Sequence, residues 1–276
     1  MPEGPEVETV RRGLHDRVVG RVIVASHATG RRSVRRYGDG PGALLAFDDD
    51  VQGLRITGTG RRGKYLWLTT DRGALMVHLR MSGQVLLHRL ADALAPHTHV
   101  VLGLDDGTQI RFVDPRTFGE MWRTDDPDVE LGHIGPDASS GAADEKWFVD
   151  RLRQRRSPVK AVLLDQRFVA GIGNIYSDEI LHLAGVRPGR RADSVSRPQC
   201  RLIARFTIEV LDSAIANGGS SLRDGQYVDV DGNAGNAAAS HRVYARVAAG
   251  CGTCGGPVTR TVVGGRSAHW CARCQR

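Results

Sequence analysis

The chain has 276 residues, enough for one large domain or two ordinary domains with proper hydrophobic cores. Its 38 Lys and Arg residues exceed its 31 Asp and Glu residues, and this basic balance favours a polyanionic partner. The first residues contain no apolar signal segment, and no run of residues is long and apolar enough to span a membrane. We therefore expect a cytosolic protein, in which a framework of disulfides is not expected.

The first predicted element is a helix that begins at Gly4-Pro5-Glu6. Proline suits the first turn of a helix, and an acidic side chain is favourable at a helix N-terminus. Val7, Val10 and Leu14 follow at the spacing of one buried helix face.

Residues 20 to 124 contain short β-type runs separated by Gly and Asp. Asp105-Asp106-Gly107 predicts a hairpin turn. Many short strands at this spacing predict a β-sandwich or a barrel. The expected strands are Gly20–Ser26, Ala43–Phe47, Leu54–Thr59, Lys64–Thr69, Ala74–Leu79, His99–Leu104 and Gln109–Val113.

A segment rich in Pro, Gly, Asp and Ser, Asp125–Asp144, is predicted to be a linker. Beyond it the apolar residues recur at helical spacing. Gly225–Ser240, rich in Gly, Asp, Asn and Ala, is predicted to be a mobile loop. The expected helices are Glu145–Gln154, Val159–Leu164, Asn174–Ala184 and Pro198–Asn217.

Four of the five cysteines form two CxxC pairs near the C-terminus, at the spacing of a structural zinc site. Disulfides conflict with the expected compartment, and a redox CxxC does not need two motifs. No ligand position is left for water, so the zinc should not be catalytic. The four ligands are Cys251, Cys254, Cys271 and Cys274. Cys200 lies outside the pattern and is expected to be a small buried apolar residue.

Between the two pairs, Thr259–Val263 and Ser267–Trp270 are predicted to form a hairpin through Gly264-Gly265-Arg266. An arginine at its tip either clamps a phosphate or lies in a solvated turn, and both interpretations stay open. Likewise, Asn174 after Gly171 and Gly173 is a good helix N-cap, which suits either a phosphate site or an ordinary helical hairpin.

The N-terminal residues carry a possible nucleophile. Loss of Met1 would free the secondary amine of Pro2, and an α-amino group has a pKa of roughly 7.7–8, against about 10.4 for lysine. Such an amine can attack an aldehyde-like sugar carbon to give a Schiff base, with Glu3 and Glu6 as general acid and base. The alternative interpretation is that the segment merely begins a helix.

Taken together, these motifs resemble those of the formamidopyrimidine-DNA glycosylase and endonuclease VIII family of base-excision repair enzymes. The resemblance covers nearly the whole chain, and the forms of the second and third motifs are typical of the formamidopyrimidine branch. It is carried by Pro2-Glu3-x-Pro5-Glu6-Val7-Glu8 with Lys64-Tyr65-Leu66, His78-Leu79-Arg80-Met81-Ser82-Gly83, Asp114-Pro115-Arg116-Thr117-Phe118-Gly119, Gly171-Ile172-Gly173-Asn174-Ile175-Tyr176 and the four cysteines.

The resemblance implies an α+β multidomain fold. It consists of an N-terminal β-sandwich with a flanking helix (1–124), a linker (125–144), a helix–two-turns–helix domain with a lesion-covering loop (145–240) and a zinc finger (241–276). It implies one structural Zn²⁺ per chain and damaged double-stranded DNA as the partner. No nucleotide cofactor and no partner subunit are expected.

The resemblance also implies the residue roles. Pro2 attacks C1′ of the damaged nucleoside, and three side chains fill the gap that a flipped nucleotide leaves. Catalytic roles are implied for Pro2, Glu3, Glu6, Lys64 and Arg266. DNA contacts are implied for His78, Met81, Arg116, Phe118, Lys160, Asn174 and Arg266.

The expected reaction is removal of oxidised purines followed by β,δ-elimination. One departure bears on the substrate: Asn236-Ala237 stands where the family has an aromatic pair in the loop that covers the flipped base. Oxidised pyrimidines are therefore an alternative substrate, and a zinc protein that binds damaged DNA without cutting it is a second alternative.

Overall fold

The computed structural model describes residues 1–40, 42–222 and 225–276. Its contacts divide the chain into two compact units. The first contains Met1–Gly132 and Asn217–Asn236, and the second contains His133–Ala216 and Ala237–Arg276. The sequence-based boundary placed residues 217–236 in the helical domain, whereas their contacts group them with the first unit.

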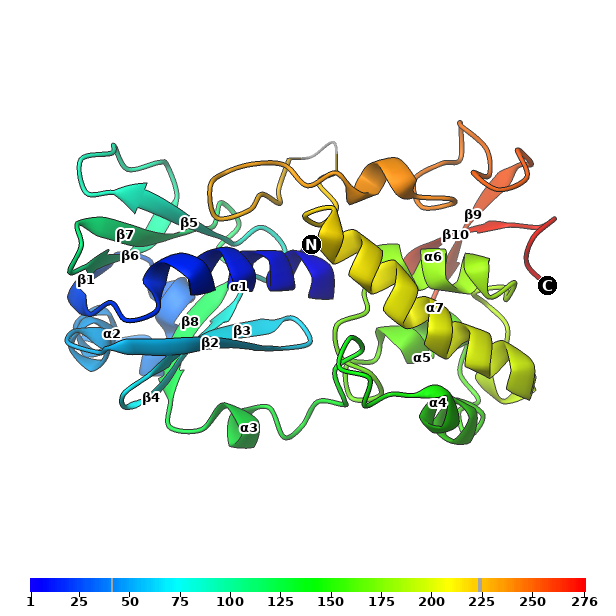
Figure 1. Ribbon diagram of the computed structural model, residues 1–276, viewed down its shortest axis with the longest axis horizontal. Coiled ribbons are helices and arrows are strands. Elements are labelled where there is room, and N and C mark those ends of the chain that lie inside the picture. Colours follow the sequence, from blue (N-terminus) through cyan, green and yellow to red (C-terminus); the bar gives the residue numbers. More distant parts are fainter. Residues whose placement is uncertain (41, 223–224) are drawn as a thin grey trace. The chain divides into compact units, whose positions relative to one another are not determined.

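The first unit is built on two four-stranded antiparallel sheets, with strand orders β1-β6-β7-β5 and β2-β3-β4-β8 (Figure 1). Buried side chains of both sheets form one hydrophobic core, as expected for a sandwich. The strands are β1 (Ile23–Ala28), β2 (Ile56–Arg62), β3 (Tyr65–Thr70), β4 (Gly73–His78), β5 (Gln84–Arg89), β6 (Thr98–Leu104), β7 (Thr108–Val113) and β8 (Glu120–Thr124). The helices are α1 (Gly4–Val18), η1 (Arg31–Tyr37), α2 (Ala43–Val51) and α3 (Pro127–Glu130).

Helix α1 begins where the sequence predicted and lies along β2 and β3 (Figure 1). Its apolar face, which includes Val7, Val10 and Leu14, is buried in the core of the first unit. The predicted hairpin turn at residues 105–107 is also confirmed, because β6 and β7 pair as antiparallel neighbours.

Several elements of the first unit differ from the prediction. The run Ala43–Phe47 belongs to helix α2, because Ala43, Phe47 and Val51 recur at four-residue spacing and are all buried. Strands β5 and β8 were missed. The segment 226–236 is not the mobile loop that its composition predicted: Tyr227 and Val230 join the core, and Leu87 N donates to Val230 O at 2.8 Å.

The second unit is helical and carries a C-terminal hairpin (Figure 1). The four predicted helices are all present within one to two residues of the expected ends. They are α4 (Glu145–Leu152), α5 (Val159–Leu164), α6 (Asn174–Leu183) and α7 (Arg197–Ala216). The short helices are η2 (Ala192–Ser194) and η3 (Ala237–Ser240), and the hairpin strands are β9 (Val258–Val263) and β10 (Arg266–Cys271).

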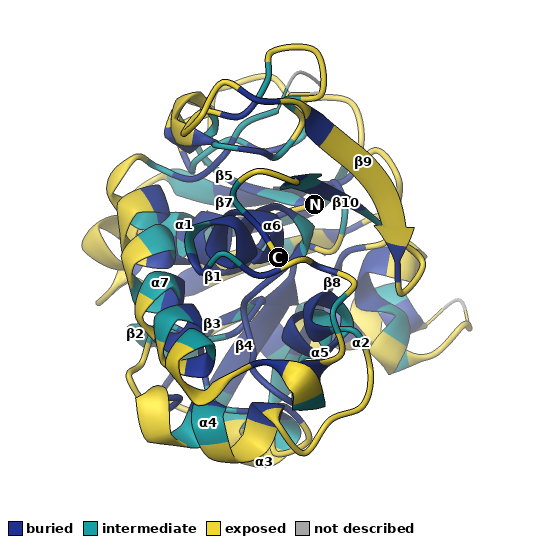
Figure 2. Ribbon diagram, turned by 90° about the vertical axis from the view of Figure 1, so that its right-hand side faces the viewer, coloured by how far each residue is buried: buried dark blue, intermediate teal, exposed yellow. Residues whose placement is uncertain are grey.

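Burial follows the amphipathic pattern of these elements. Helix α7 shows a buried stripe and an exposed stripe, and β9 is mostly exposed (Figure 2). Cys200 is fully buried on α7, as predicted. In the part of the chain that the structure describes, no helix has the length and apolar character needed to cross a membrane.

Candidate active site

The N-terminal residues are held by a reciprocal capping box at the start of α1. The Glu3 carboxylate accepts from the backbone N–H of Glu6, and Glu3 N donates to Glu6 Oε2 at 2.8 Å. Both side chains are buried. Pro2, which is also buried, therefore precedes a rigid first turn whose geometry two carboxylates fix.

Glu6 also binds the segment 217–236 of the same unit. Its Oε1 accepts from Ser220 N at 2.7 Å. Gly219 adopts a φ of +80°, and a Cβ there would lie 3.0 Å from Glu6 Cγ, so a larger residue would displace the carboxylate. Burial, with the nearby Glu6 charge, raises the pKa of Tyr227 well above its usual value, and this neutral phenol donates to Gly218 O at 2.9 Å. Glu6 is thus placed as a support for the N-terminus and for this segment.

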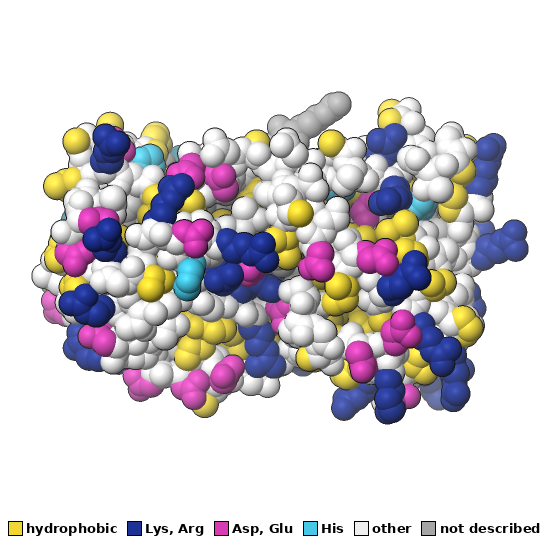
Figure 3. Space-filling view, in the orientation of Figure 1, with side chains coloured by type: hydrophobic (Ala, Val, Ile, Leu, Met, Phe, Trp, Pro, Cys, Tyr) yellow, Lys and Arg dark blue, Asp and Glu magenta, His cyan; other side chains and the backbone are white. Residues whose placement is uncertain are grey.

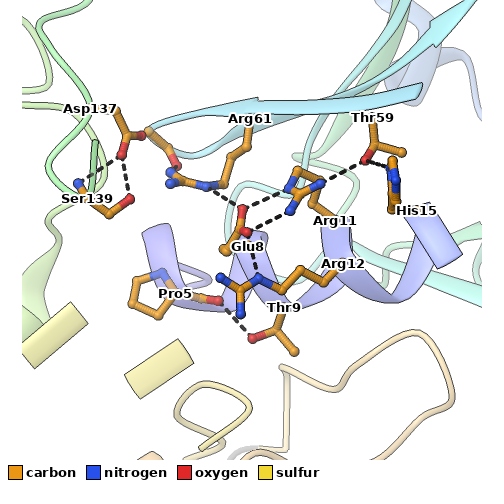
Figure 4. Close-up of polar contacts among 11 residues, drawn as sticks. Pro5, Glu8, Thr9, Arg11, Arg12, His15, Thr59, Arg61, Asp137 and Ser139 are labelled. Atoms are coloured by element: carbon orange, nitrogen blue, oxygen red, sulfur yellow. Dashed lines mark hydrogen bonds and ion pairs between the residues drawn. The ribbon is translucent and has the colours of Figure 1, made fainter. Parts of the chain in front are cut away.

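Glu8 ties the same helix to the sheet (Figure 4). It accepts from Arg11 and Arg12 on its own helix and from Arg61 Nε of β2 at 3.0 Å. Burial raises the pKa of Glu8, but the hydrogen bonds of Arg11 and Arg12 and the charges of Arg11 and Arg61 outweigh it and lower the value to about 2. The carboxylate therefore stays ionised and anchors α1 on β2.

Lys64 directly precedes β3 and His78 is the last residue of β4, at the end of the sheet where Tyr65 pairs with His78. Lys64 is 8% exposed and follows the positive-φ Gly63 in the turn between β2 and β3. His78 is also buried, and its ring packs edge-on against Tyr65 with centroids 4.4 Å apart.

The protonation state of His78 follows from its surroundings. Burial, together with the charges of Arg80 and Lys64, lowers its pKa well below 6.5. Arg80 N donates to His78 Nδ1 at 2.9 Å, so the single proton of the neutral ring belongs on Nε2. A neutral imidazole with a fixed Nε2–H is a hydrogen-bond donor suited to a phosphate oxygen.

Met81, Arg116 and Phe118 come from two turns, one after β4 and one between β7 and β8. Phe118 is 42% exposed although it is apolar, and the Arg116 guanidinium lies 5.0 Å from the centre of its ring. Arg80 and Thr117, the neighbours of these residues, adopt positive φ angles of 53° and 54°. Such angles are rare for residues other than glycine, so both turns depend on the contacts that hold them.

One buried carboxylate supplies those contacts. Asp114 Oδ1 accepts from Ser82 Oγ at 2.6 Å and from Arg116 N at 3.2 Å, and Oδ2 accepts from Gly119 N at 2.7 Å. Asp114 is fully buried. It therefore joins the turn of Met81 to the turn of Arg116 and Phe118.

In the second unit, Lys160 and Asn174 both contact Ser267, the neighbour of Arg266 at the start of β10. Asn174 Nδ2 donates to Ser267 Oγ at 3.1 Å, and Lys160 Nζ donates to Ser267 O at 2.7 Å. Asn174 is not the N-cap that the sequence predicted; it is the first helical residue, and Gly173 is the N-cap. Arg266 is exposed.

Lys160, which the resemblance assigned to DNA binding, has a fully buried side chain, and its Nζ lies 2.6 Å from Asp178 Oδ1. Asp178 Oδ2 in turn accepts from His269 N at 2.8 Å. The lysine therefore links α5, α6 and β10 inside the unit, and its contact with DNA stays a prediction.

The four cysteines meet as predicted. Their Sγ atoms all lie within 4.8 Å of one another, with separations of 3.9 Å for one pair and 3.5 Å for another. Tetrahedral zinc with Zn–S bonds of about 2.3 Å needs sulfur atoms about 3.8 Å apart, so the donor set fits Zn²⁺. The backbone N–H groups of Thr253 and Gly256 point at two of the sulfurs, and His182 Nε2 lies 3.3 Å from Cys251 Sγ.

Several supporting residues escaped the sequence reasoning. Asp114 and Asp178 are buried acids, and Glu179 accepts from the three consecutive N–H groups of residues 242–244 at 2.7–2.9 Å. An acid inside an apolar helix face is the one local signal that could have indicated Asp178 and Glu179. The partners of all three lie far along the chain or across a turn.

A β-sandwich with a buried proline–carboxylate N-terminus, together with a helical unit that carries a four-cysteine metal hairpin, defines a zinc-finger protein of the DNA-repair glycosylase class. Family models support this assignment over most of the chain. The formamidopyrimidine-DNA glycosylase N-terminal domain matches residues 1–121, its H2TH domain matches residues 134–226, and the zinc finger found in FPG and IleRS matches residues 251–276.

Full-length relatives agree. The formamidopyrimidine-DNA glycosylase of Corynebacterium jeikeium is 41% identical over the whole of both chains, and that of Mycobacterium avium is 43% identical over all of this chain and 98% of its own. A Lactococcus lactis Fpg variant bound to Fapy-dG-containing DNA superposes with a TM-score of 0.88 at 35% identity, covering both chains fully. The chain belongs to the formamidopyrimidine-DNA glycosylase family.

Proposed function

We propose that the protein is a bifunctional DNA glycosylase and AP lyase of base-excision repair, and that the N-terminal amine of Pro2 is its nucleophile. The observation that carries the proposal is the buried Pro2 in front of the capping box of Glu3 and Glu6. This arrangement holds Pro2 N, which becomes a free amine once Met1 is removed. Membership of the formamidopyrimidine-DNA glycosylase family supplies the reaction class.

In the proposed reaction, Pro2 N attacks C1′ of the damaged nucleoside, and the glycosidic bond breaks with its electrons passing to the base. The attacking amine loses its N–H proton, and the C1′–O4′ bond of the sugar then opens as O4′ takes up a proton, which gives an iminium. This iminium has no N–H proton to lose, so it stays cationic and acidifies the neighbouring C2′–H. Loss of that proton expels the 3′ phosphate, and a second elimination expels the 5′ phosphate. Glu3 is the residue best placed to assist proton transfer, because it is adjacent to Pro2.

The remaining site residues hold the DNA. Lys64 and the Nε2–H of His78 would bind phosphates from the first unit, and Asn174 and Arg266 would bind them from the second unit. Met81, Arg116 and Phe118 would fill the gap left by the flipped nucleotide, with Asp114 holding their two turns. The four-cysteine zinc positions the hairpin and supplies no chemistry. We place its action on chromosomal DNA, as a monomer.

The substrate class is tested with a lesion panel in one duplex sequence. Solved Lactococcus lactis Fpg complexes contain Fapy-dG in one case and an oxidised pyrimidine in another, so the panel includes 8-oxoguanine, a formamidopyrimidine, an oxidised pyrimidine and an abasic site. We expect cleavage with phosphate left on both ends, and the oxidised purines to be preferred. Cleavage of the pyrimidine lesion alone would favour the alternative substrate, and binding without any cleavage would favour the non-catalytic alternative.

A further inference from the structure

The 3₁₀ segment η1 carries four arginines in seven residues and touches the turn of Phe118. Arg32 Nη1 donates to Thr117 Oγ1 at 3.4 Å, and Arg35 Nη2 donates to Phe118 O at 3.2 Å. Both contacts are inside the first unit. The arginines of η1 therefore lie beside the side chains proposed to enter the DNA.

Two of these arginines are neutralised within the protein. Arg35 Nη2 lies 2.9 Å from a carboxylate oxygen of Glu120, and Arg36 pairs with Glu130. The Arg36 guanidinium also lies 3.6 Å above the ring of Trp122. These two guanidinium groups brace the segment on β8 and on the helix that follows it.

Arg31 and Arg32 are different. Both are exposed, and within the described ranges 1–40, 42–222 and 225–276 neither has an acidic side chain at ion-pair distance. On the face drawn in Figure 3, basic and acidic side chains are interspersed. Among the described residues no ion pair compensates the charges of Arg31 and Arg32, which can therefore meet an anionic partner.

The arginines surround a hollow of about 350 Å³. Three guanidinium groups and a single carboxylate line it, and a guanidinium presents donors in the planar geometry that matches a phosphate. The lining residues are Arg31, Arg32, Arg35, Asp39, Thr117 and Phe118.

We infer that η1 is a phosphate clamp for the DNA strand opposite the lesion, with Arg31 and Arg32 as its contacts. The inference rests on the proposed function, in which Arg116 and Phe118 fill the gap beside the orphaned base. The backbone next to that base belongs to the complementary strand, and the arginines of η1 flank the turn that reaches it. Arg35 keeps this turn in place through Phe118 O.

The test compares Arg31→Ala/Arg32→Ala with a control that removes the same charge, Arg21→Ala/Arg89→Ala. The control arginines are exposed in the same unit but line a different hollow beside Asp92 and Asp106, and Arg21 lies 3.1 Å from Asp106. Affinity for a duplex with a tetrahydrofuran abasic analogue is measured over a salt series. Each lost phosphate contact lowers the slope of log K against log salt by about 0.9, so we expect a decrease of about 1–2 for the clamp variant and none for the control.

Strand assignment uses neutral methylphosphonates. Placed in the complementary strand around the orphaned base, they should weaken binding by wild type but not by the clamp variant. Placed in the lesion strand, they should weaken both equally. The inference is overturned if the clamp variant keeps the wild-type salt slope. It is also overturned if binding by the clamp variant becomes insensitive to methylphosphonates in the lesion strand instead of the complementary strand.

Two further measurements keep the outcome unambiguous. Melting curves of the variants establish that they are folded. If the double variant does not fold, the single variant Arg31→Ala replaces it in the salt series, because Arg31 has an exposed side chain. Wild-type cleavage of the lesion duplex is measured in parallel. Absence of wild-type binding and cleavage refutes the proposed function, whereas normal wild-type activity with an unchanged slope in the variant refutes only the clamp.

Discussion

Asp114→Asn tests whether one buried carboxylate holds both turns that carry the residues proposed to fill the gap. Asparagine has the same shape but replaces one oxygen with an NH₂ group. Placed at Oδ2, that group faces the N–H of Gly119; placed at Oδ1, it faces the N–H of Arg116. In either orientation one backbone N–H loses its acceptor, which costs about 1–3 kcal/mol in a buried site. The remaining bonds lose the assistance of the charge, so we expect a total destabilisation of about 2–4 kcal/mol.

Urea denaturation measures the loss of stability, and fluorescence anisotropy with a tetrahydrofuran duplex measures its effect on binding. We expect weaker binding, because the turns of Met81 and of Arg116 and Phe118 are no longer joined. Ser82→Ala is the matched control: it removes one donor to Asp114, leaves both backbone bonds, and should cost about 1 kcal/mol. Stability of Asp114→Asn within about 0.5 kcal/mol of wild type, with unchanged affinity, would refute this reasoning.

Three further outcomes are expected. Lys160→Met should lower the free energy of unfolding by about 3–5 kcal/mol, because it leaves the buried Asp178 carboxylate without its ion-pair partner. Adding Asp178→Asn should recover part of the loss. Additive effects of the two substitutions in calorimetry would contradict this coupling. Because the pKa of folded His78 is depressed, the unfolded state takes up the proton first as the pH falls through 6.5. Between about pH 7.5 and 5.5 wild type should therefore lose up to about 1.4 kcal/mol more stability than His78→Gln, and equal pH profiles of the two proteins would contradict a depressed pKa of His78. Chelation of zinc should abolish DNA binding while circular dichroism still reports the β-sandwich; unchanged affinity after verified metal loss would count against the role of the finger.

Local patterns were sufficient for most of the fold. The helices of the second unit have a clear 3.6-residue period, and the cysteine spacing alone specified the metal hairpin. The error at Ala43–Phe47 has a physical explanation: five residues are too short to distinguish a buried strand from a buried helix, and the period becomes visible only when Val51 is included.

The composition of residues 225–236 was misleading for another reason. Gly, Asp and Asn predict a loop, but two apolar residues, Tyr227 and Val230, are enough to anchor that loop in the core of the first unit. Tertiary burial of this kind depends on β5, which is distant in the sequence and was itself missed.

The site could be predicted only where a motif lies within a few consecutive residues. Glu3 and Glu6 lie within four consecutive residues at the start of the predicted helix, close enough to share one turn. Lys160 shows the limit: no local pattern indicated that its side chain is buried, because its partner Asp178 lies on the next helix. An ion pair between two different helices leaves no pattern in the sequence around either residue.

The central claim is that the secondary amine of Pro2 is the nucleophile, and borohydride trapping tests it most directly. Protein from which Met1 has been removed is incubated with an 8-oxoguanine or abasic duplex and reduced, and the adduct is mapped by peptide mass spectrometry. The control is the same chain with one extra residue retained before Pro2, which blocks the amine and changes no side chain. We predict a covalent adduct on Pro2 in the processed protein, and DNA binding without an adduct in the control. No adduct from the processed protein, or an adduct on a lysine in both, would contradict the account.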